Sequence, residues 1–367
     1  MQRRTISSRP WDLCRLGILM EPDPADPREA EGVLNPAVAR GLDGHLYLLP
    51  RLVAAGNYSR IGLARVVFDR CGNPVGVERH GVVLEPGEPY ERNPQSGGGV
   101  EDPRVTYLAA QRRYLMTYTA LGPTGPRIAL ALSHDLMRWE RLGLVPFAPC
   151  HDVDLGTLDN KDALVFPEPV CAPDGRPALA LIHRPTFRTQ PWWLSDARPS
   201  LWISYAPLND FLSGREILFG QHQLLAGPQQ GWERLKVGGG TPPVRTSAGW
   251  LILYHGAAGP IVTDVSQPRG VCYSAGLLLL DLCDPRRVLY RSARSILQHW
   301  GGARHADRAT ESCYGTCGLS APPRSILCLL PHDNPEQQGG NDGCSIWNLL
   351  LHKLGHRRPA VHHAIAS

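Results

Sequence analysis

The stretch Leu46-Tyr-Leu-Leu-Pro-Arg51 decides the fold, because three later stretches repeat its apolar run that ends on a polar or aromatic residue. These are Tyr114-Leu-Met-Thr-Tyr118, Leu179-Ala-Leu-Ile-His183 and Leu251-Ile-Leu-Tyr-His255. Their last residues are 67, 65 and 72 positions apart. This spacing is too long for a solenoid repeat and suits a four-stranded propeller blade with generous loops.

A second strand-like run follows each of these stretches, at residues 59–65, 126–132, 201–205 and 273–277. Frequent turn residues (38 Gly and 34 Pro) and few helical periods agree with an all-β chain. We therefore predict a five-bladed β-propeller; a β-sandwich with coincidental spacing is the alternative. If the repeated stretches are the innermost strands, Arg51, His183 and His255 converge on one basic axial pocket.

Composition limits the class of protein. The 367 residues are 43% apolar and carry a net charge of +4 without a long basic run, which indicates a soluble globular protein and argues against nucleic acid as a partner. The longest apolar run, from Ala275, is cut by Asp281 and is too short to span a membrane, and no signal peptide follows the basic N-terminus. Ten scattered cysteines without paired metal-ligand spacing predict free thiols, a cytoplasmic location and no metal site.

The stretch Gly97-Gly-Gly-Val-Glu-Asp-Pro-Arg104 sets two acids and a base beside three glycines at the start of a strand. Glycines let a backbone approach a ligand closely. Taken alone, the stretch is typical of a solvated turn with an ion pair. Its place between the first and second repeats makes it a candidate for the wall of the predicted pocket.

Several short motifs, in order over residues 32–297, resemble those of the β-1,4-mannosyl phosphorylases and related enzymes of glycoside hydrolase family 130. They are Asn35-Pro36, Asn57-Tyr-Ser-Arg-Ile-Gly-Leu-Ala64, Gly99-Val-Glu-Asp-Pro-Arg104, Asn160-Lys-Asp-Ala-Leu-Val-Phe-Pro167, His183-Arg-Pro185, Leu235-Lys-Val-Gly-Gly-Gly-Thr-Pro-Pro243 and Leu253-Tyr-His-Gly256. The resemblance implies a five-bladed propeller with the active site in its central funnel.

The resemblance also implies roles for individual residues. Asp102 would be the catalytic acid of an inverting phosphorolysis of β-1,4-mannosides to mannose 1-phosphate, with the proton passing through a hydroxyl of the mannosyl unit. Cations would hold the phosphate, which is a co-substrate, so no cofactor is implied. The phosphate-binding candidates are Arg51, Arg60, Lys236 and His255, and the substrate-binding candidates are Asn35, Asn57, Arg104, Asp162, His183 and Arg184.

Two other functions stay open. A hydrolase of the same family would need a second carboxylate to activate water, and Glu101, Asp162 and Glu168 are the candidates. A catalytically impaired sugar-binding propeller is the third possibility. One loop departs from the family resemblance. In the phosphorylases it supplies a polar or basic contact to phosphate, whereas here it reads Ala120-Leu-Gly-Pro-Thr-Gly125 and the nearest cation is Arg127.

The tryptophans suit either packing or sugar stacking, and packing is the commoner role. Trp192, Trp193 and Trp202 are the candidates for stacking on a sugar, whereas Trp139 and Trp232 suit the core and turns of the blades. The acceptor sugar, its linkage and the oligomeric state, with a homo-oligomer as one option, are not determined by these patterns.

Three segments follow from these observations: an irregular N-terminal arm over residues 1–31, the catalytic propeller over 32–297 and an atypical tail over 298–367. The tail turns abruptly to Arg, His, Cys, Gly and Ser. We expect one strand near residues 325–330, a short amphipathic helix over 346–354 and an incomplete or altered fifth blade. A reading-frame change in the gene is the simplest explanation of such a tail.

Overall fold

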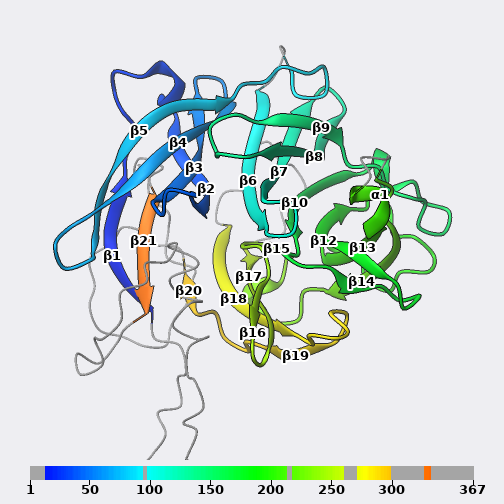
Figure 1. Ribbon diagram of the computed structural model, residues 1–367. Helices are drawn as coiled ribbons and strands as arrows, with labels where there is room; N and C mark the ends of the chain where they lie inside the picture. The colour runs from blue at the N-terminus through cyan, green and yellow to red at the C-terminus, as the bar shows by residue number, and fades with distance from the viewer. Residues whose placement is uncertain (1–12, 94–96, 213–216, 260–270, 299–325, 332–367) are drawn as a thin grey trace, which may run out of the picture.

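The structure, a computed structural model, describes residues 13–93, 97–212, 217–259, 271–298 and 326–331 (Figure 1). Most of these residues lie in β-strands that form four antiparallel meanders of four strands. The first meander consists of β2 (Gly32–Arg40), β3 (Leu46–Ala54), β4 (Tyr58–Phe68) and β5 (Pro74–Leu84). The second consists of β6 (Gly98–Leu108), β7 (Arg113–Gly122), β8 (Gly125–Ser133) and β9 (Glu140–Leu144).

The third and fourth meanders have the same order of strands. The third consists of β10 (Asp159–Val165), β12 (Pro177–Thr186), β13 (Leu201–Pro207) and β14 (Gly220–Ala226). The fourth consists of β15 (Lys236–Gly239), β17 (Gly249–Ala258), β18 (Cys272–Leu280) and β19 (Val288–Arg291).

Short elements complete the described part. Three small strands extend existing sheets: β11 (Val170–Cys171), β16 (Val244–Thr246) and β20 (Leu297–Gln298). A separate pair joins β1 (Leu13–Met20) to β21 (Ile326–Pro331). The helical elements are η1 (Pro27–Glu29), η2 (Leu155–Thr157), η3 (Gly231–Glu233) and α1 (Leu208–Leu212).

The apolar core lies between successive meanders. The second strands β3, β7, β12 and β17 are buried over almost their whole length, which explains their nearly continuous apolar sequences. Three large clusters fill the spaces between the meanders, represented by Tyr114 and Ile61, by Leu181 and Phe219, and by Ile203 and Tyr254. Each first strand contacts the first strand of the next meander, from β2 through β6 and β10 to β15.

The first two meanders are also joined by a short parallel pairing of β4 with β6, between Ser59 and Gly99. A Cβ atom on Gly99 would lie 2.2 Å from the carbonyl oxygen of Ser59, and the φ of this glycine is +112°. Only glycine fits such a close approach with this backbone. The glycine run therefore brings β6, with its acidic residues, against the end of β4.

In three meanders a buried glutamate in the segment before the first strand pairs with an arginine of the fourth strand. Glu91 accepts hydrogen bonds from Tyr118 Oη at 2.7 Å and from Arg141 Nε at 2.9 Å. Glu233 is bound in the same way by Tyr254 and Arg291, and Glu29 by Arg79. These clamps show that the meanders are repeats of one structural unit, although the glutamates gave no repeat signal in the sequence.

The structure corrects two details of the sequence prediction. The strands predicted to be the first of each unit are the second, because β2, β6, β10 and β15 precede them. The N-terminal arm is also not wholly irregular, since it contains β1. The strand expected near residues 325–330 exists as β21, and the helix expected over 346–354 lies outside the described residues.

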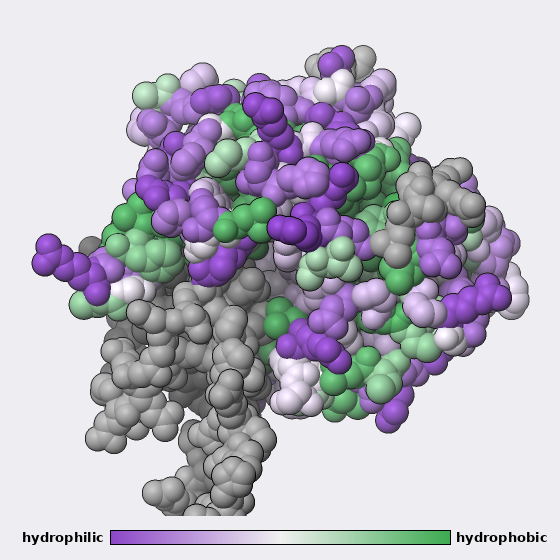
Figure 2. All heavy atoms as spheres, viewed as in Figure 1, coloured by the Kyte–Doolittle hydropathy of each residue, from purple (hydrophilic) through white to green (hydrophobic). Residues whose placement is uncertain are grey.

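Five cysteines in the described part of the chain are free thiols, as expected: Cys71, Cys150, Cys171, Cys272 and Cys283. No helix among the described residues is long and apolar enough to cross a membrane. On the face shown in Figure 2, hydrophilic and apolar side chains are interspersed.

Candidate active site

Three first strands carry a residue with left-handed backbone at the same structural position. These residues are Asn35 in β2, Asp102 in β6 and Asp162 in β10, with φ values of 45°, 48° and 57°. Each lies at an interruption in the pairing of its strand with the second strand. Asparagine and aspartate tolerate this conformation better than other side chains, and such bulges redirect a side chain and cluster at functional sites.

Asp102 lies among donors from three strands. Its Oδ1 accepts hydrogen bonds from Asn35 Nδ2 at 2.8 Å and from Arg51 Nη1 at 3.2 Å. Its carbonyl oxygen accepts a hydrogen bond from Arg104 Nη1. The carboxylate is thus held through Oδ1 by side chains of the first meander.

Arg51 connects Asp102 to its neighbour Glu101. The guanidinium donates from Nη2 to Glu101 Oε1 at 2.7 Å and from Nε to Ser59 Oγ at 2.8 Å. Glu101 is 1% exposed, and its other oxygen lies 3.6 Å from Lys161 Nζ. Two cations from different meanders therefore neutralise this buried carboxylate.

Asp162 organises a second cluster. Its Oδ2 accepts a hydrogen bond from Arg184 Nε at 2.6 Å and lies 3.6 Å from His255 Nε2. Its Oδ1 lies 3.7 Å from Arg104 Nη2, which also donates to the carbonyl oxygen of Gly239 at 3.1 Å. Arg104 therefore bridges the Asp102 and Asp162 clusters.

Gly238 makes the contact between Asp162 and His255 possible. A Cβ atom at this position would lie 2.2 Å from Asp162 Oδ2 and 2.5 Å from His255 Nε2. Gly238 pairs with His255 across β15 and β17. The glycine-rich motif that follows Lys236 thus leaves room for two functional side chains.

Lys236 and His255 share one aromatic neighbour, Tyr273 of β18. Lys236 Nζ lies 5.1 Å from the centre of the Tyr273 ring, and the His255 ring lies 5.8 Å from it. The lysine makes a cation–π contact with this ring, which leaves its ammonium donors available to an anion.

The pKa values of the two adjacent carboxyl groups, Asp102 and Glu101, are shifted in opposite directions. Burial tends to raise the pKa of Asp102, but Arg51, Arg104 and the Asn35 amide outweigh it and lower that pKa. Burial dominates at Glu101 and raises its pKa, despite Arg51 and Lys161. Environments that separate two such pKa values are typical of sites that move protons.

In the Asp162 cluster the pKa values of both Asp162 and His255 are lowered. Burial opposes ionisation of Asp162, but Arg184, His255 and Arg104 together hold its pKa below the ordinary value. Burial, helped by the nearby Arg184, Arg104 and Lys236, lowers the pKa of His255 to about 4 and outweighs the opposing attraction of Asp162. Near neutral pH the site therefore holds an ionised Asp162 and a neutral His255.

Of the eleven predicted site residues, eight lie in or beside these two clusters: Asn35, Arg51, Asn57, Asp102, Arg104, Asp162, Arg184 and His255. Asn57 reaches them by accepting a hydrogen bond from Arg51 Nη2 at 3.1 Å. Lys236 lies beside His255 through Tyr273. Arg60 and His183 have their contacts elsewhere.

Arg60 lies on the face of β4 opposite to Ser59. Its Nε donates to Glu85 Oε2 at 2.8 Å, its guanidinium lies over the Tyr58 ring, and its Nη1 is buried without a hydrogen-bond partner. His183 is fully buried, with Nδ1 bonded to Asn160 and Nε2 to Ser204 Oγ. The contacts of these two residues are therefore with groups other than Asp102 and Asp162.

Sequence reasoning missed Lys161 and Tyr273. Lys161 lies inside the motif Asn160–Pro167, directly before the predicted residue Asp162, so its position was an available signal. Tyr273 begins a predicted strand and gave no chemical signal. Arg127, the cation nearest to the altered loop, contacts Asp159 at 3.3 Å and the carbonyl oxygen of Thr157.

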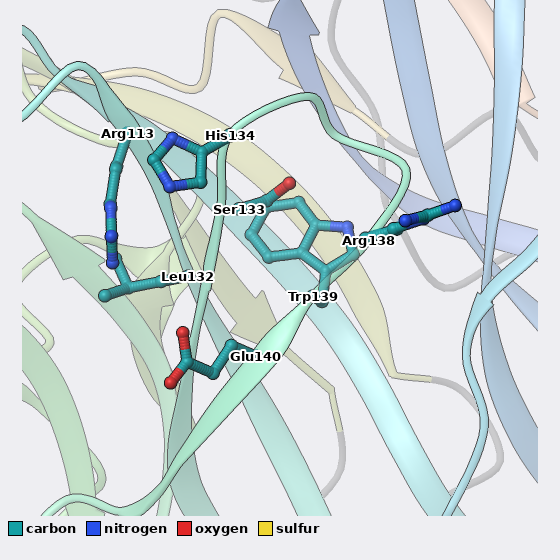
Figure 3. Close-up of a pocket in the computed structure, with 7 residues that line it drawn as sticks. All are labelled: Arg113, Leu132, Ser133, His134, Arg138, Trp139 and Glu140. Atoms are coloured by element: carbon teal, nitrogen blue, oxygen red, sulfur yellow. The ribbon is translucent and has the colours of Figure 1, made fainter.

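The described residues form no metal-ligand cluster at this site, and a pocket that they do form lies elsewhere. No group of three or more His, Cys, Asp or Glu side chains in the described part of the chain is placed to hold a metal ion. A small pocket lies at the other end of the second meander, lined by residues that include Arg113, His134, Arg138 and Trp139 (Figure 3). It contains none of the predicted site residues.

The site combines paired carboxylates with arginines, two lysines and a histidine on neighbouring strands, and is a candidate acid–base site that could also hold an anion. The chain belongs to glycoside hydrolase family 130: residues 15–299 match the family profile described as β-1,4-mannooligosaccharide phosphorylase.

The chain is similar to enzymes of both mannoside linkages. It is 34% identical over 210 residues to a β-1,2-mannobiose phosphorylase of Listeria innocua, which covers 57% of this chain and 48% of that protein. It is 26% identical over 232 residues to a β-1,4-mannooligosaccharide phosphorylase of Ruminococcus albus, which covers 63% of this chain and 58% of that protein. The chain thus spans about half the length of the curated relatives it matches.

A solved structure supports the same relationship. The complex of the Listeria innocua β-1,2-mannobiose phosphorylase with β-1,2-mannobiose superimposes with a TM-score of 0.55 and 25% identity, over 76% of this chain and 81% of that chain.

Proposed function

We propose that this protein is an inverting β-mannoside phosphorylase with Asp102 as the general acid. The observation that carries the proposal is the pairing of every other carboxylate considered for catalysis. Glu101 is neutralised by Arg51 and Lys161, and Asp162 by Arg184 and Arg104. Glu168 is exposed and pairs with Arg245 at 3.3 Å.

An inverting hydrolase needs a second carboxylate that is free to activate water, whereas a phosphorylase uses an anionic nucleophile and needs cations. The excess of cationic groups at the site favours phosphate over water. Arg51, Lys236 and His255 are the proposed phosphate ligands. Arg60 stays a candidate through its Nη1 donor, although its Nε is held by Glu85.

The sugar would be bound by planar polar side chains around Asp102. Asn35, Arg104, Asp162 and Arg184 have the geometry for this role, because they hold fixed donor or acceptor positions next to the acid. Asn57 would act through Arg51. His183 would act through its buried contact with Asn160, since both of its ring nitrogens are already bonded.

In the proposed reaction a phosphate oxygen attacks the anomeric carbon while the bond from that carbon to the bridging oxygen breaks. The leaving oxygen takes a proton that Asp102 supplies through a mannosyl hydroxyl, and the product is mannose 1-phosphate with inverted configuration. Asp102 remains as a carboxylate and regains a proton from solvent.

The lowered pKa of Asp102 gives phosphate a second role. A phosphate anion beside Arg51 offsets the positive charge that keeps Asp102 ionised, so its arrival raises the pKa of Asp102. The acid would then be protonated when the nucleophile is present, which disfavours cleavage by water.

We further propose that the four meanders are blades of a five-bladed propeller and that residues 32–297 form its catalytic part. The fifth blade would be incomplete or altered, with β1 and β21 as the strands of the described chain near its position. A reading-frame change before residue 298 stays our explanation for the tail. Translating the other two frames of the gene tests it, because one of them should then encode a pair of propeller strands.

The linkage is the least constrained feature. The motif resemblance favoured β-1,4-mannosides, while the Listeria innocua enzyme named for β-1,2-mannobiose has the higher identity of the two relatives described. Both linkages should be assayed.

One assay tests the proposed function. Purified protein is incubated with β-1,2- and β-1,4-mannobiose, each with and without phosphate, and the products are separated. Mannose 1-phosphate formed only with phosphate is the expected result. Free mannose formed regardless of phosphate would support a hydrolase, and no product from either disaccharide would support an impaired sugar-binding protein.

A further inference from the structure

The loop over residues 187–200, between β12 and β13, exposes Trp192, whereas the adjacent Trp193 is half-buried against the core. Trp192 is 82% exposed, the largest exposed fraction among the large apolar side chains of the described residues. Trp193 packs in the core cluster, 5.9 Å from the Phe187 ring and 6.1 Å from the Trp202 ring. The predicted packing role therefore fits Trp193 and Trp202 but not Trp192.

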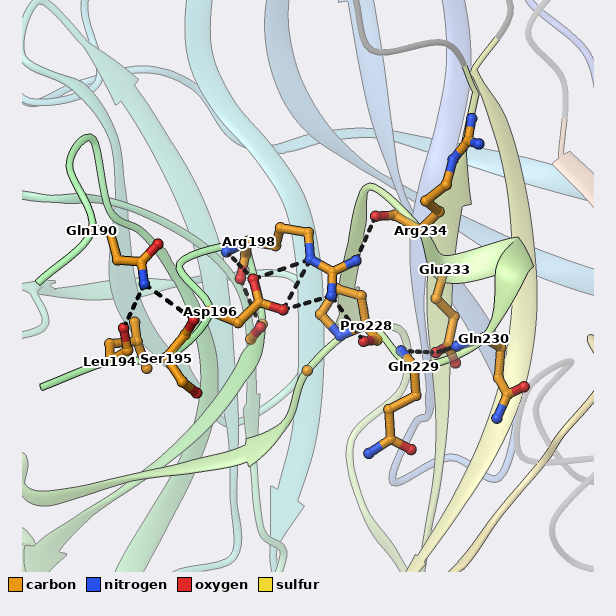
Figure 4. Close-up of polar contacts among 12 residues, drawn as sticks. Gln190, Leu194, Ser195, Asp196, Arg198, Pro228, Gln229, Gln230, Glu233 and Arg234 are labelled. Atoms are coloured by element: carbon orange, nitrogen blue, oxygen red, sulfur yellow. Dashed lines mark hydrogen bonds and ion pairs between the residues drawn. The ribbon is translucent and has the colours of Figure 1, made fainter.

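The exposure of Trp192 does not follow from a loosely held loop. Gln190 Nε2 donates to the carbonyl oxygens of Leu194 at 2.9 Å and Ser195 at 3.1 Å (Figure 4). Arg198 pairs with Asp196 and donates from Nη1 to the carbonyl oxygen of Arg234 at 2.9 Å. The indole is thus presented to solvent by a preorganised backbone, which lowers the entropy cost of binding a ligand.

The loop borders the candidate active site at both ends. It begins after Thr186, only two residues beyond Arg184, which binds Asp162. At its other end the carbonyl oxygen of Pro199 accepts a hydrogen bond from Val237 N at 3.0 Å, next to Lys236. Trp192 therefore lies on a loop, the rim loop, whose two ends are next to residues of the site.

Polar groups accompany the exposed indole. The His151 ring lies 6.4 Å from the Trp192 ring and 4.6 Å from the Trp193 ring. The Asp152 carboxylate accepts a hydrogen bond from Trp193 Nε1 at 2.9 Å and is itself exposed. An aromatic face beside a carboxylate suits a pyranose ring, whose C–H face stacks on the aromatic while its hydroxyls donate to acceptors.

A protein partner fits this surface less well. Trp192 is the one exposed large apolar side chain among the described residues between Leu144 and Leu218. Protein interfaces are built around contiguous patches, whereas a single indole among polar groups matches a single sugar ring.

We propose that Trp192 forms a distal sugar subsite, which stacks on a mannosyl unit remote from the bond being cleaved and selects longer oligosaccharides. This inference rests on the proposed function, because the ligand is the oligosaccharide whose reacting end lies at Asp102. Asp152 and His151 supply hydrogen bonds to the hydroxyls of the same unit.

The test compares Trp192→Ala and Trp192→Phe with the parent protein on mannobiose and mannotetraose of the linkage that the protein cleaves. Loss of stacking should raise KM for the tetraose roughly three- to tenfold with kcat kept, leave mannobiose unchanged, and be partly restored by phenylalanine. Tyr290→Ala is the matched control, since Tyr290 is an exposed aromatic (44%) on β19 outside the rim loop.

Equal changes on both substrates, no change on the tetraose, or an altered sedimentation coefficient of Trp192→Ala would overturn the proposal. If the parent protein turns over neither linkage, the proposed function fails and the subsite is tested by binding alone. Binding of β-1,2- or β-1,4-mannotetraose should then quench the indole fluorescence of the parent protein but not that of Trp192→Phe. Quenching that persists in Trp192→Phe, or is absent from the parent, would contradict the subsite.

Discussion

Arg51 holds two consecutive carboxylates at once, with Nη1 3.2 Å from Asp102 Oδ1 and Nη2 2.7 Å from Glu101 Oε1. One guanidinium thus lowers the pKa of the proposed acid and neutralises the buried residue before it. We therefore expect a lysine at position 51 to hold the two carboxylates less well, because only the planar guanidinium reaches both of them.

Removal of Arg51 should destabilise the protein. In Arg51→Ala the buried Glu101 keeps only the Lys161 contact, and an uncompensated buried charge costs about 3 kcal/mol of unfolding free energy. Arg60→Ala is the control, because Arg60 pairs with the half-exposed Glu85 and such a pair contributes at most about 1 kcal/mol. Urea denaturation of both variants measures the difference; equal losses would contradict the account of Arg51.

A methyl group at Gly238 should disrupt the Asp162 cluster without unfolding the protein. The new Cβ would overlap Asp162 Oδ2 and the His255 ring, and a misplaced binding group costs on the order of 100-fold in activity. Gly231→Ala is the control, since no atom lies within 4 Å of a Cβ at that position. Phosphorolysis rates and circular dichroism decide: equal activity in the two variants would remove Gly238 from the site.

Acid should destabilise the protein through a histidine pair, the buried His183 and the half-buried His222. His183 and His222 both bond to Ser204 Oγ at 2.7 Å, and burial lowers the pKa of His183 to about 3 and also lowers that of His222. Because the folded-state pKa values lie below the unfolded value of about 6.5, the stability is fully present above pH 6.5 and falls as the pH drops toward 3.

Each histidine kept neutral by the fold contributes a loss of up to about 1.4 kcal/mol per pH unit in that window. His183→Gln should therefore have a shallower dependence of unfolding free energy on pH between 6.5 and 4.5 than the parent protein. Parallel curves from urea denaturation across this range would show that His183 is not held neutral.

The strands, and most of the residues that cluster in the candidate site, were predictable because they depend on local sequence patterns. The continuous apolar sequences of β3, β7, β12 and β17 report burial on both faces, and the motif residues Asp102, Arg104 and Asp162 do lie in connected clusters. The structural equivalence of Asn35, Asp102 and Asp162 could not be predicted, because a β-bulge adds a residue of no characteristic type.

The alignment of strand ends was correct for Arg51 and His255 and one residue out of register for the other two strands. In the paired strands Arg51, Thr119, Arg184 and His255 are equivalent, opposite Leu34, Glu101, Lys161 and Gly238. A shift of one residue turns a side chain to the other face of a strand. This is why Tyr118 and His183 lie in the core while Arg184 reaches Asp162.

The central claim is that Asp102 is the general acid of a phosphorolysis. It is tested most directly by measuring the activity of Asp102→Asn on two substrates, of which only one has a leaving group that needs a proton. Phosphate-dependent cleavage of mannobiose should fall by roughly 100- to 10,000-fold. Cleavage of 2,4-dinitrophenyl β-mannoside, whose leaving group needs no proton, should stay close to that of the parent protein. Equal losses on both substrates, or this pattern in Glu101→Gln instead, would contradict the assignment of Asp102.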